Sequence, residues 1–549
     1  MWNHAAVPAA PDSAAPSATP PGGRTGVPPR PGLTLTALII GAFVCNVNLS
    51  VANIALPDIG RAFDASQTAL TLVAVGCSLG LAMSVLYFGA IGDRFGRRRM
   101  LLLGLAITIP ASLVSATAGS TEMIMAGRIA TGLAAGMSYP TTLALINALW
   151  APGPTRTRAI ALWSGISGGA AMIGPTLSGV LLTRFWWGSV FLIAVPFAAV
   201  GLVLVWRTVP AHVNESTEPV DHLGGALSVL AIAALVTGIT LISSPGKLAT
   251  ALAILGGAAV GLLLFAWRQA KAANPLYDLH VAARRLFWVP AVSGMVALGS
   301  LVGAMYVGQQ FLQNVLHYST VEAGFAAVPG VIGMVLAAPR SARLITARGT
   351  RVSMLIGYAF LGPAFLVMLL TWKEGAPYWW VGLGYLLVGL GVGFSGPPAS
   401  RSLTGSVPVT RVGMGSGTAD LQRDLGGSIM QAAFGSLLTA GYAVAFGRAI
   451  AASPQAASVS SATRSALLQS YEGAAAVAAR YPQYQDAIVA AARSSFLDGA
   501  NWAYTAGLVA MLAGALLVAT CFPDHAGEQA LAAEYHRIDG EPDTTPAPA

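Results

Sequence analysis

The sequence predicts an all-α protein embedded in a membrane. Of the 549 residues, 55% are hydrophobic and only 9% are charged, whereas soluble globular proteins carry about 25% charged residues. The mean hydropathy is +0.66. Helices need about 20 apolar residues to cross a bilayer and barrel strands only about 10, and the apolar runs here have the helical length. Membrane-spanning helices are therefore expected.

Fourteen apolar segments are long enough to span a bilayer. Pairs of small residues four positions apart, such as Gly132 and Gly136, recur within them, which is typical of helices that approach closely in lipid. The predicted spans are residues 34–56, 69–91, 100–118, 123–149, 158–182, 189–206, 223–243, 249–267, 287–313, 321–344, 352–372, 378–400, 414–446 and 498–522.

The basic residues predict how the chain lies in the membrane. An even number of spans places both termini on one side, and twenty Lys and Arg residues fall on that side, against four in the short loops of the other side. Loops rich in Lys and Arg face the cytoplasm. We therefore expect a multi-pass protein of the cytoplasmic membrane with both termini in the cytoplasm.

Three segments are too polar to span. Residues 1–32 are rich in Pro, Ala, Ser and Gly and predict a disordered cytoplasmic tail, and the end of the chain, 523–549, is similar in composition. Residues 447–497 are Ala-rich with few helix breakers, which predicts a pair of short amphipathic helices on the outer face. This pair either forms a gate or is a loop that only packs on the bundle.

Charged side chains are rare inside the predicted spans. Asp420, Arg423 and Asp424 lie together in the run GSGTADLQRDLGGSIMQAAFG, and Arg128 lies in the span 123–149. A charge deep in a transmembrane helix costs roughly 2.5–3.5 kcal/mol on insertion scales, and such residues face the bundle interior or an aqueous cavity. The i, i+3, i+4 spacing places the three clustered residues on one helix face. This cluster is the main candidate for a functional site.

Two interpretations of the cluster remain open. Arg423 could hold one carboxylate ionised while the other, which is desolvated and repelled, binds a proton; we assign that proton to Asp424, within a pair that titrates together. Alternatively, the three residues form a structural ion triad that braces the span. Arg128 likewise either relays or counters a charge during proton coupling or binds backbone carbonyls.

The run GAIGDRFGRRRM, residues 89–100, connects the second and third spans. Its glycines let the helix ends turn tightly, its Asp can accept hydrogen bonds from a helix N-terminus or a neighbouring Arg, and its arginines hold the loop at the cytoplasmic face. The spacing G-x-x-x-D-R-x-G-R-R-R resembles the signature loop of the major facilitator superfamily, and residues 342–351 keep a weaker copy, as expected for two homologous halves. The motif residues are Gly89, Asp93, Arg94, Gly96, Arg97 and Arg98.

Three further runs resemble the fourteen-span drug:proton antiporter branch of that superfamily. They are NLSVANIALP (48–57), GRIATGLAAG (127–136) and GPTLSG (174–179), in which Gly174, Pro175 and Gly179 match the antiporter motif. The resemblance covers residues 33–522. Asn48 stands where an Asp is usual, so the acids for proton coupling are expected only in the span 414–446.

The resemblance implies a major-facilitator fold. It predicts six-helix bundles at 33–207 and 269–522, the second of which includes the loop 447–497, and two inserted transmembrane helices within 208–268. It also implies proton-coupled efflux of hydrophobic, often cationic drugs or toxic compounds by alternating access, and hence antibiotic resistance. The alternative is a dedicated exporter of one endogenous metabolite, lipid or antibiotic. An enzyme is not expected, because the spans contain no nucleophile–base constellation.

Polar and aromatic residues inside the spans are the candidate lining of a substrate cavity. Aromatic faces beside carboxylates suit lipophilic cations through cation–π attraction. The amides of the span 287–313 either face the bundle interior or reflect plain polarity at the membrane interface. The candidates are Asn46, Asn48, Tyr139, Trp163, Tyr306, Gln309, Gln310 and Gln313.

The sequence also limits the expected partners. No G-x-x-x-x-G-K-[ST] loop occurs, so we expect the proton gradient, with no cofactor, to drive the protein. The seven histidines fall outside the spans or at their ends, and no metal site is expected. The net charge of +8 follows from the topology and does not indicate nucleic acid. The expected partners are protons, a small drug-like molecule and the lipid bilayer around a monomer.

Overall fold

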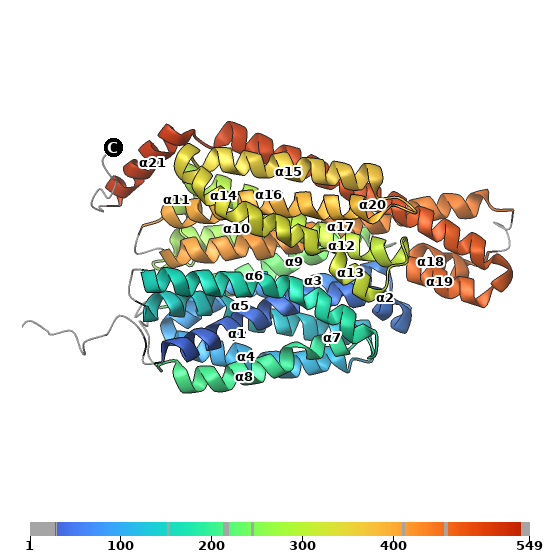
Figure 1. Cartoon of the computed structure of the whole chain (residues 1–549), viewed down its shortest axis with the longest axis horizontal. Coiled ribbons are helices and arrows are strands. Elements are labelled where there is room, and N and C mark those ends of the chain that lie inside the picture. Colours follow the sequence, from blue (N-terminus) through green and yellow to red (C-terminus); the bar gives the residue numbers. More distant parts are fainter. Residues whose placement is uncertain are drawn as a thin grey trace, which may run out of the picture.

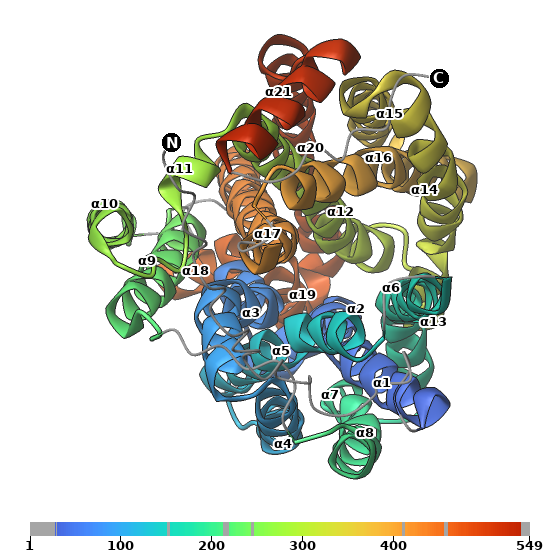
Figure 2. The ribbon, with the colours of Figure 1, turned by 90° about the vertical axis from the view of Figure 1, so that its left-hand side faces the viewer.

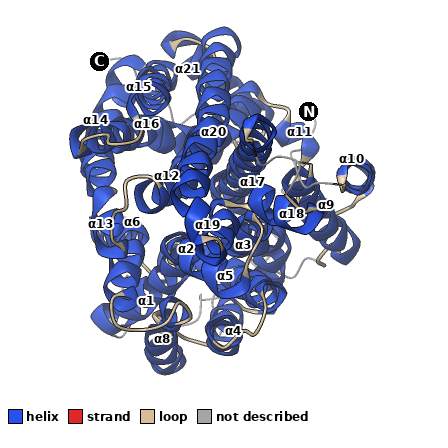
Figure 3. Cartoon of the chain, turned by 90° about the vertical axis from the view of Figure 1, so that its right-hand side faces the viewer, coloured by secondary structure: helices blue, strands red, loops and turns tan. Residues whose placement is uncertain are grey.

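The structure is a computed structural model of the chain. It describes residues 28, 30–150, 154–211, 219–242, 246–408, 412–454 and 459–539. Within these ranges the regular structure is helical, without strands, and most helices run along the long axis of the molecule (Figures 1 and 3). Most of the predicted tail 1–32 and the last ten residues lie outside the described residues.

Eight helices form a first group, which we call the N-half. Within it, α3 and α4 pack on α5, and α1 packs on α6 and α8. Its members are α1 (Pro31–Ser50), α2 (Ala52–Phe63), α3 (Gln67–Phe95), α4 (Arg97–Ala116), α5 (Thr121–Leu149), α6 (Pro154–Leu182), α7 (Ser189–Leu192) and α8 (Ala194–Thr208).

A second group, the C-half, contains the remaining long helices apart from one hairpin. In it, α16 packs on α14 and α15, and α17 packs on α12 and α20. Its members are α11 (Leu279–Ala282), α12 (Arg285–Asn314), α13 (Thr320–Ala326), α14 (Val328–Arg348), α15 (Thr350–Thr371), α16 (Tyr378–Gly405), α17 (Val412–Ala452), α18 (Ser461–Gln469), α19 (Tyr471–Arg480), η3 (Pro482–Tyr484), α20 (Gln485–Cys521) and α21 (His525–Ile538).

The hairpin α9 (His222–Leu241) and α10 (Leu248–Lys271) connects the two halves. Helix α9 packs on α3 of the N-half and α17 of the C-half, whereas α10 packs mainly on α9 and forms the outermost part of this side (Figure 2). At one end, Arg268 Nε and Gln269 Nε2 each donate to the buried Asp221 carboxylate at 3.0 Å. These bonds close the hairpin.

The helices confirm the predicted all-α membrane fold. Among the described residues, thirteen helical segments are long and apolar enough to cross a membrane. Helix α6, with 29 residues, lies at the position of the remaining predicted span, 158–182. Each of the fourteen predicted spans therefore coincides with a helix or with a pair of consecutive helices.

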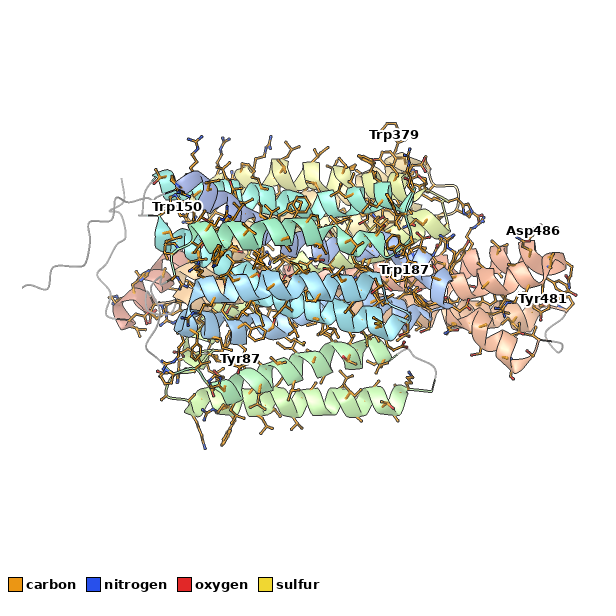
Figure 4. The ribbon with its side chains drawn as sticks, turned by 90° about the horizontal axis from the view of Figure 1, so that it is seen from below. Tyr87, Trp150, Trp187, Trp379, Tyr481 and Asp486 are labelled. Atoms are coloured by element: carbon orange, nitrogen blue, oxygen red, sulfur yellow. The ribbon has the colours of Figure 1, made fainter. Side chains whose placement is uncertain are left out.

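The two ends of the bundle differ. We call the end with the turn between α3 and α4 the basic end, and the opposite end the cap end, after the cap formed by α18 and α19 (Figure 1). Figure 4 shows Trp150 at the basic end, and Tyr481 and Asp486 beyond the bundle at the cap end. A glycine with a positive φ lies between two helices at two related places: Gly96 (φ 110°) between α3 and α4, and Gly349 (φ 85°) between α14 and α15. The two related runs therefore make similar turns, and a positive φ favours glycine.

Two segments differ from their predicted form. Helix α20 begins at Gln485, before the predicted span start at residue 498, because the Ala-rich stretch ahead of the span continues the helix. Residues 525–538, predicted to be part of a polar tail, form α21 on the C-half. Glu528 accepts from the backbone N–H of Thr350 at 2.9 Å, and Arg284 pairs with Asp539 at 2.5 Å. These polar contacts hold α21 although its sequence is not apolar.

Glycines set the close approach of several helices. At the crossing of α14 and α16, a Cβ added to Gly389 would lie 1.6 Å from the carbonyl oxygen of Gly330. In lipid, such backbone contact is a main source of helix association.

We expect Gly389→Ala to destabilise the protein by about 3 kcal/mol, the upper part of the range for overpacking, because the backbone of α14 must move. Gly256→Ala on α10 is the matched control, since a Cβ there meets nothing within 4 Å and removing a helical glycine is neutral or favourable. The midpoint of thermal unfolding in detergent measures both. Equal midpoints for the two variants would contradict this account of the crossing.

Candidate functional site

The cluster on α17 contains one guanidinium between two carboxylates. Arg423 Nε donates to Asp424 Oδ1 at 3.0 Å and Nη2 to Asp424 Oδ2 at 3.3 Å, while Nη2 lies 3.8 Å from Asp420 Oδ1. The side chain of Asp424 is 2% exposed, whereas those of Asp420 and Arg423 are 19% and 30% exposed. Asp424 is thus sealed inside the protein, and the other two side chains border an accessible space.

Tyr139 of the N-half joins this cluster. Arg423 Nη1 donates to Tyr139 Oη at 3.0 Å, and the guanidinium carbon lies 4.5 Å from the centre of the Tyr139 ring, which is cation–π geometry. The ring also lies 5.6 Å from that of Trp163, whose Nε1 donates to Thr142 Oγ1 at 3.0 Å. Two predicted cavity residues, from α5 and α6, therefore combine with the predicted triad from α17.

The two asparagines predicted for the cavity make local bonds. Asn46 Nδ2 donates to the carbonyl of Ala42 at 3.0 Å, and Asn48 Nδ2 donates to that of Val44 at 2.9 Å. Asn46 is partly exposed and Asn48 is buried. Both side-chain amides thus form hydrogen bonds with backbone carbonyls of their own helix, α1.

The other predicted cavity residues lie in the contact between the halves near the cap end. Gln67 Nε2 of α3 donates to Tyr306 Oη and to Gln310 Oε1, both at 2.9 Å, and Thr71 Oγ1 is 2.7 Å from Tyr306 Oη. Tyr306 and Gln310 are fully buried. In this structure, therefore, these α12 residues join the halves and do not line an open space.

The neighbouring amides of α12 extend this contact. Gln313 Nε2 donates to the carbonyl of Ile54 in α2 at 3.3 Å. Gln309 is fully buried, and neither polar atom of its side chain has a hydrogen-bond partner among the described residues. Sequence reasoning overlooked Gln67 and Thr71 as their counterparts, because Gln67 lies just before the predicted start of the second span.

The antiporter motif also lies at a close contact. A Cβ on Gly174 would meet Ser50 Oγ of α1 at 2.2 Å, and one on Gly179 would meet the carbonyl oxygen of Thr320 in α13 at 2.6 Å. Thr320 Oγ1 donates to the carbonyl of Gly179 at 3.3 Å. Gly179 thus brings the two halves together near the cap end. Pro175 lies in the same helix, and its side chain is outside the described part.

Arg128 is buried within the N-half. Its Nη1 donates to the carbonyl of Asn48 and its Nε to that of Val73 at 3.4 Å. The guanidinium carbon lies 5.7 Å from the centre of the Phe191 ring. These contacts correspond to the second of the two interpretations, in which Arg128 binds backbone carbonyls and so joins α5 to α1 and α3.

The residues of the signature loop form hydrogen bonds to other residues of the N-half. Arg97 Nε donates to Asp93 Oδ1 at 2.9 Å and Arg97 Nη1 to the carbonyl of Ala144 at 3.4 Å. Arg98 Nη2 donates to the carbonyl of Trp206 at 2.6 Å, and the Arg94 guanidinium lies 6.0 Å from the centre of the Phe95 ring. A Cβ on Gly89 would meet nothing within 4 Å, so no close approach requires that glycine here.

The geometry is that of a polar site inside a two-part helical membrane protein, and the sequence comparisons agree with it. The family model described as Major Facilitator Superfamily matches residues 38–431. The chain belongs to the Major Facilitator Superfamily. This membership places the protein among transporters and not among enzymes.

Two curated proteins illustrate the relationship. The chain is 31% identical over 409 residues to the "Multidrug resistance protein Stp" of Mycobacterium tuberculosis, covering 74% of this chain and 76% of that protein. It is 30% identical over 497 residues to the "Multidrug efflux pump LfrA" of Mycolicibacterium smegmatis, covering 90% and 96%.

A solved structure shares the fold. The crystal structure of a bacterial homolog of the human lysosomal transporter Spinster, in an inward-facing and unoccupied conformation, matches with a TM-score of 0.60 and 15% identity, covering 94% of this chain and 99% of that one. Among the described residues of the present chain, no group of three or more His, Cys, Asp or Glu side chains could hold a metal ion.

We expect Gln67→Leu to destabilise the protein by about 2 kcal/mol, because it leaves Gln310 Oε1 buried without this hydrogen bond and removes one from Tyr306 Oη. Gln529→Leu on the exposed face of α21 is the control and should change stability by less than about 0.5 kcal/mol. Thermal unfolding in detergent compares the two. A midpoint for Gln67→Leu as high as that of the control would show that these bonds do not stabilise the contact.

Proposed function

We propose that this protein exports hydrophobic, often cationic drugs or toxic compounds across the cytoplasmic membrane in exchange for protons. The observation that carries the proposal is the arrangement on α17: two carboxylates share one Arg, and one of them faces an accessible space while the other is sealed. A structural ion triad would not require an exposed member. The proton gradient, without a cofactor, supplies the energy.

The contacts support an order of events at the pair. Asp424 receives two hydrogen bonds from Arg423, whereas Asp420 lies 3.8 Å from the same guanidinium. Asp420 is the less firmly paired carboxylate and the more exposed one, so it is the group that water and a cationic substrate reach first. We therefore assign the exchanged proton to Asp420, in place of the Asp424 suggested by the sequence, with Asp424 holding Arg423 in position.

The aromatic residues beside Asp420 and Arg423 support the type of substrate. The Tyr139 ring already binds the Arg423 guanidinium, and Trp163 packs beside it. A lipophilic cation could replace that guanidinium on the ring face while its charge pairs with a carboxylate. The relatives named as a multidrug resistance protein and a multidrug efflux pump support export of more than one compound.

The contacts between the halves support alternating access. Near the cap end the halves meet through Gln67 and Tyr306, and through Gly179 and Thr320. We propose that this is the state closed at the outer, cap end, with the site around Asp420 accessible from the cytoplasmic, basic end. Movement of the two halves as rigid bodies would then reverse the access.

Other motif residues take supporting roles in this proposal. Arg128 fixes the junction of α1 and α2 against α5 through the Asn48 carbonyl. The ion pair of Asp93 and Arg97, with the turn at Gly96, keeps α3 and α4 together while the halves move. Both termini lie on the cytoplasmic side, and the transporter acts as a monomer in the bilayer.

We expect Asp420→Asn and Asp424→Asn each to reduce drug-driven proton flux in proteoliposomes by more than about tenfold, because each removes an ionisable member of the pair. Asp498→Asn is the control, since Asp498 is an exposed carboxylate on α20 and should leave the flux unchanged. Unchanged flux in both cluster variants would refute proton exchange at this site.

Growth protection tests the range of substrates. Cells that produce the protein should survive several chemically different lipophilic cations, because the aromatic and carboxylate groups recognise charge and apolar surface and not one shape. Protection should be lost with Asp420→Asn. Protection against a single compound only would instead indicate a dedicated exporter of one metabolite, lipid or antibiotic.

A further inference from the structure

Glu472, at the start of α19, is a buried carboxyl in the cap. The residue is 4% exposed. Asn314 Nδ2 of α12 donates to its Oε1 at 2.9 Å, and its Oε2 has no hydrogen-bond partner among the described residues. Burial of a carboxyl with an unsatisfied oxygen is costly, and Glu472 lies outside the cluster on α17.

Glu472 lies where the cap touches the N-half. A Cβ on Gly60 of α2 would be 2.9 Å from Glu472 Cγ, so the glycine leaves room for this side chain. Next to it, Ser470 Oγ donates to the carbonyl of Ala65, in the turn after α2, at 3.2 Å. The Glu472 side chain is therefore enclosed between α19 and α2.

The cap itself is held by the C-half. Tyr442 Oη of α17 donates to the carbonyls of Leu467 at 3.1 Å and Ser470 at 2.9 Å. If the two halves separate at the cap end, the cap stays with α17, and Glu472 leaves its position against α2. Closing and opening this end thus transfers the carboxyl between a buried site and water.

The charged and titratable groups around Glu472 do not compensate an ionised carboxylate. From α2, Arg61 is the cation that faces it, but that side chain is 66% exposed and pairs with Asp58. The other titratable neighbours are phenols: Tyr306 of α12, Tyr442 of α17 and Tyr471 of α19 itself. Hydrogen bonds from Asn314, Ser470 and the backbone of Glu472 favour the ionised form, but desolvation is the larger effect. A negative charge here would be desolvated without a paired cation, whereas a neutral acid would not incur that cost.

We propose that Glu472 is a proton-operated latch: the cap end closes with this carboxyl protonated, and loss of the proton favours the open cap end. In this arrangement the Glu472 proton comes from and returns to the cap side, so it does not cross the membrane. The latch makes the conformation of the cap end depend on pH even when no substrate is bound. It requires only that the halves separate at the cap end, and not that the cargo is a drug.

The direction of the pH effect follows from burial. Desolvation raises the pKa of Glu472 in the closed state above its ordinary value, whereas in the open state the carboxyl should titrate near about 4.3, like an exposed Glu. Between these two pKa values, the closed state holds one proton more than the open state. The ratio of open to closed molecules should therefore rise by about tenfold per pH unit in that window and level off above the closed-state pKa.

A distance measurement across the contact tests this latch. Spin labels are placed at Ala62→Cys on α2 and Ala479→Cys on α19, both exposed, in a chain whose native cysteines have been replaced. Electron–electron distance distributions are recorded from pH 5 to pH 9 in detergent, without drug and without a gradient. The native cysteines to be replaced by Ala are Cys45, Cys77 and Cys521.

The proposal predicts a short-distance population at pH 5 and a growing long-distance population as the pH rises. Glu472→Gln, which keeps the side-chain shape without the titration, should hold the short distance across the range. Asp486→Asn, an exposed carboxyl at the start of α20, should respond like the parent chain. A parent chain that does not respond to pH, or a Glu472→Gln chain that responds like it, would overturn the latch.

The result is independent of the proposed drug export. A failed proton-flux assay would leave the distance measurement intact, because no substrate is present. A flat distance profile would in turn leave the Asp420–Asp424 exchange untouched, because those carboxylates lie in the first half of α17 and the labels report on the cap.

Discussion

The organisation of this protein depends on a single guanidinium that must remain paired inside a membrane. Arg423 binds Asp424 on its own helix and Tyr139 on the opposite half, with Asp420 beside it. In a medium of low dielectric, neither a bare Arg nor a bare carboxylate is tolerated. In the proposed exchange, a proton or cation that neutralises one carboxylate would change the partners of Arg423, and this change would reach the N-half through Tyr139. The Arg423–Tyr139 contact is thus the point at which the proposed exchange would act on the relative position of the halves.

Polar side chains contribute to the contact between the halves near the cap end, beside the close approach at Gly179. Within the C-half, glycines bring backbones together, as at Gly389 and Gly330, and lipid provides nothing that replaces such packing. Between the halves, near the cap end, side-chain amides and hydroxyls such as those of Gln67 and Tyr306 bond to each other. In the proposed alternating access, water can take the place of these hydrogen-bond partners when the contact opens, which lowers the cost of breaking them.

The sequence predicted most of the helices and the central cluster, because both are encoded locally. Apolar length determines a span, and the i, i+3, i+4 spacing places Asp420, Arg423 and Asp424 on one face. Other features depend on contacts between distant residues. The buried contact of Tyr306 with Gln67 joins residues 239 positions apart, and no local pattern distinguishes it from a cavity lining. Likewise α21, with a polar sequence, is held by Arg284 and Thr350 far along the chain.

Helix α17 provides a physical connection between the central cluster and the cap. It runs unbroken for 41 residues, Val412–Ala452, and carries Arg423 in its first half and Tyr442, which holds the cap, in its second. At a rise of about 1.5 Å per residue, these two residues are about 28 Å apart along the axis. Because a continuous helix moves largely as one body, a displacement of α17 that follows a change of partner at Arg423 also moves the cap, and with it Glu472. If both sites favour the same movement, linkage requires the effect to be reciprocal: closure of the cap must then alter proton binding at Asp420 and Asp424.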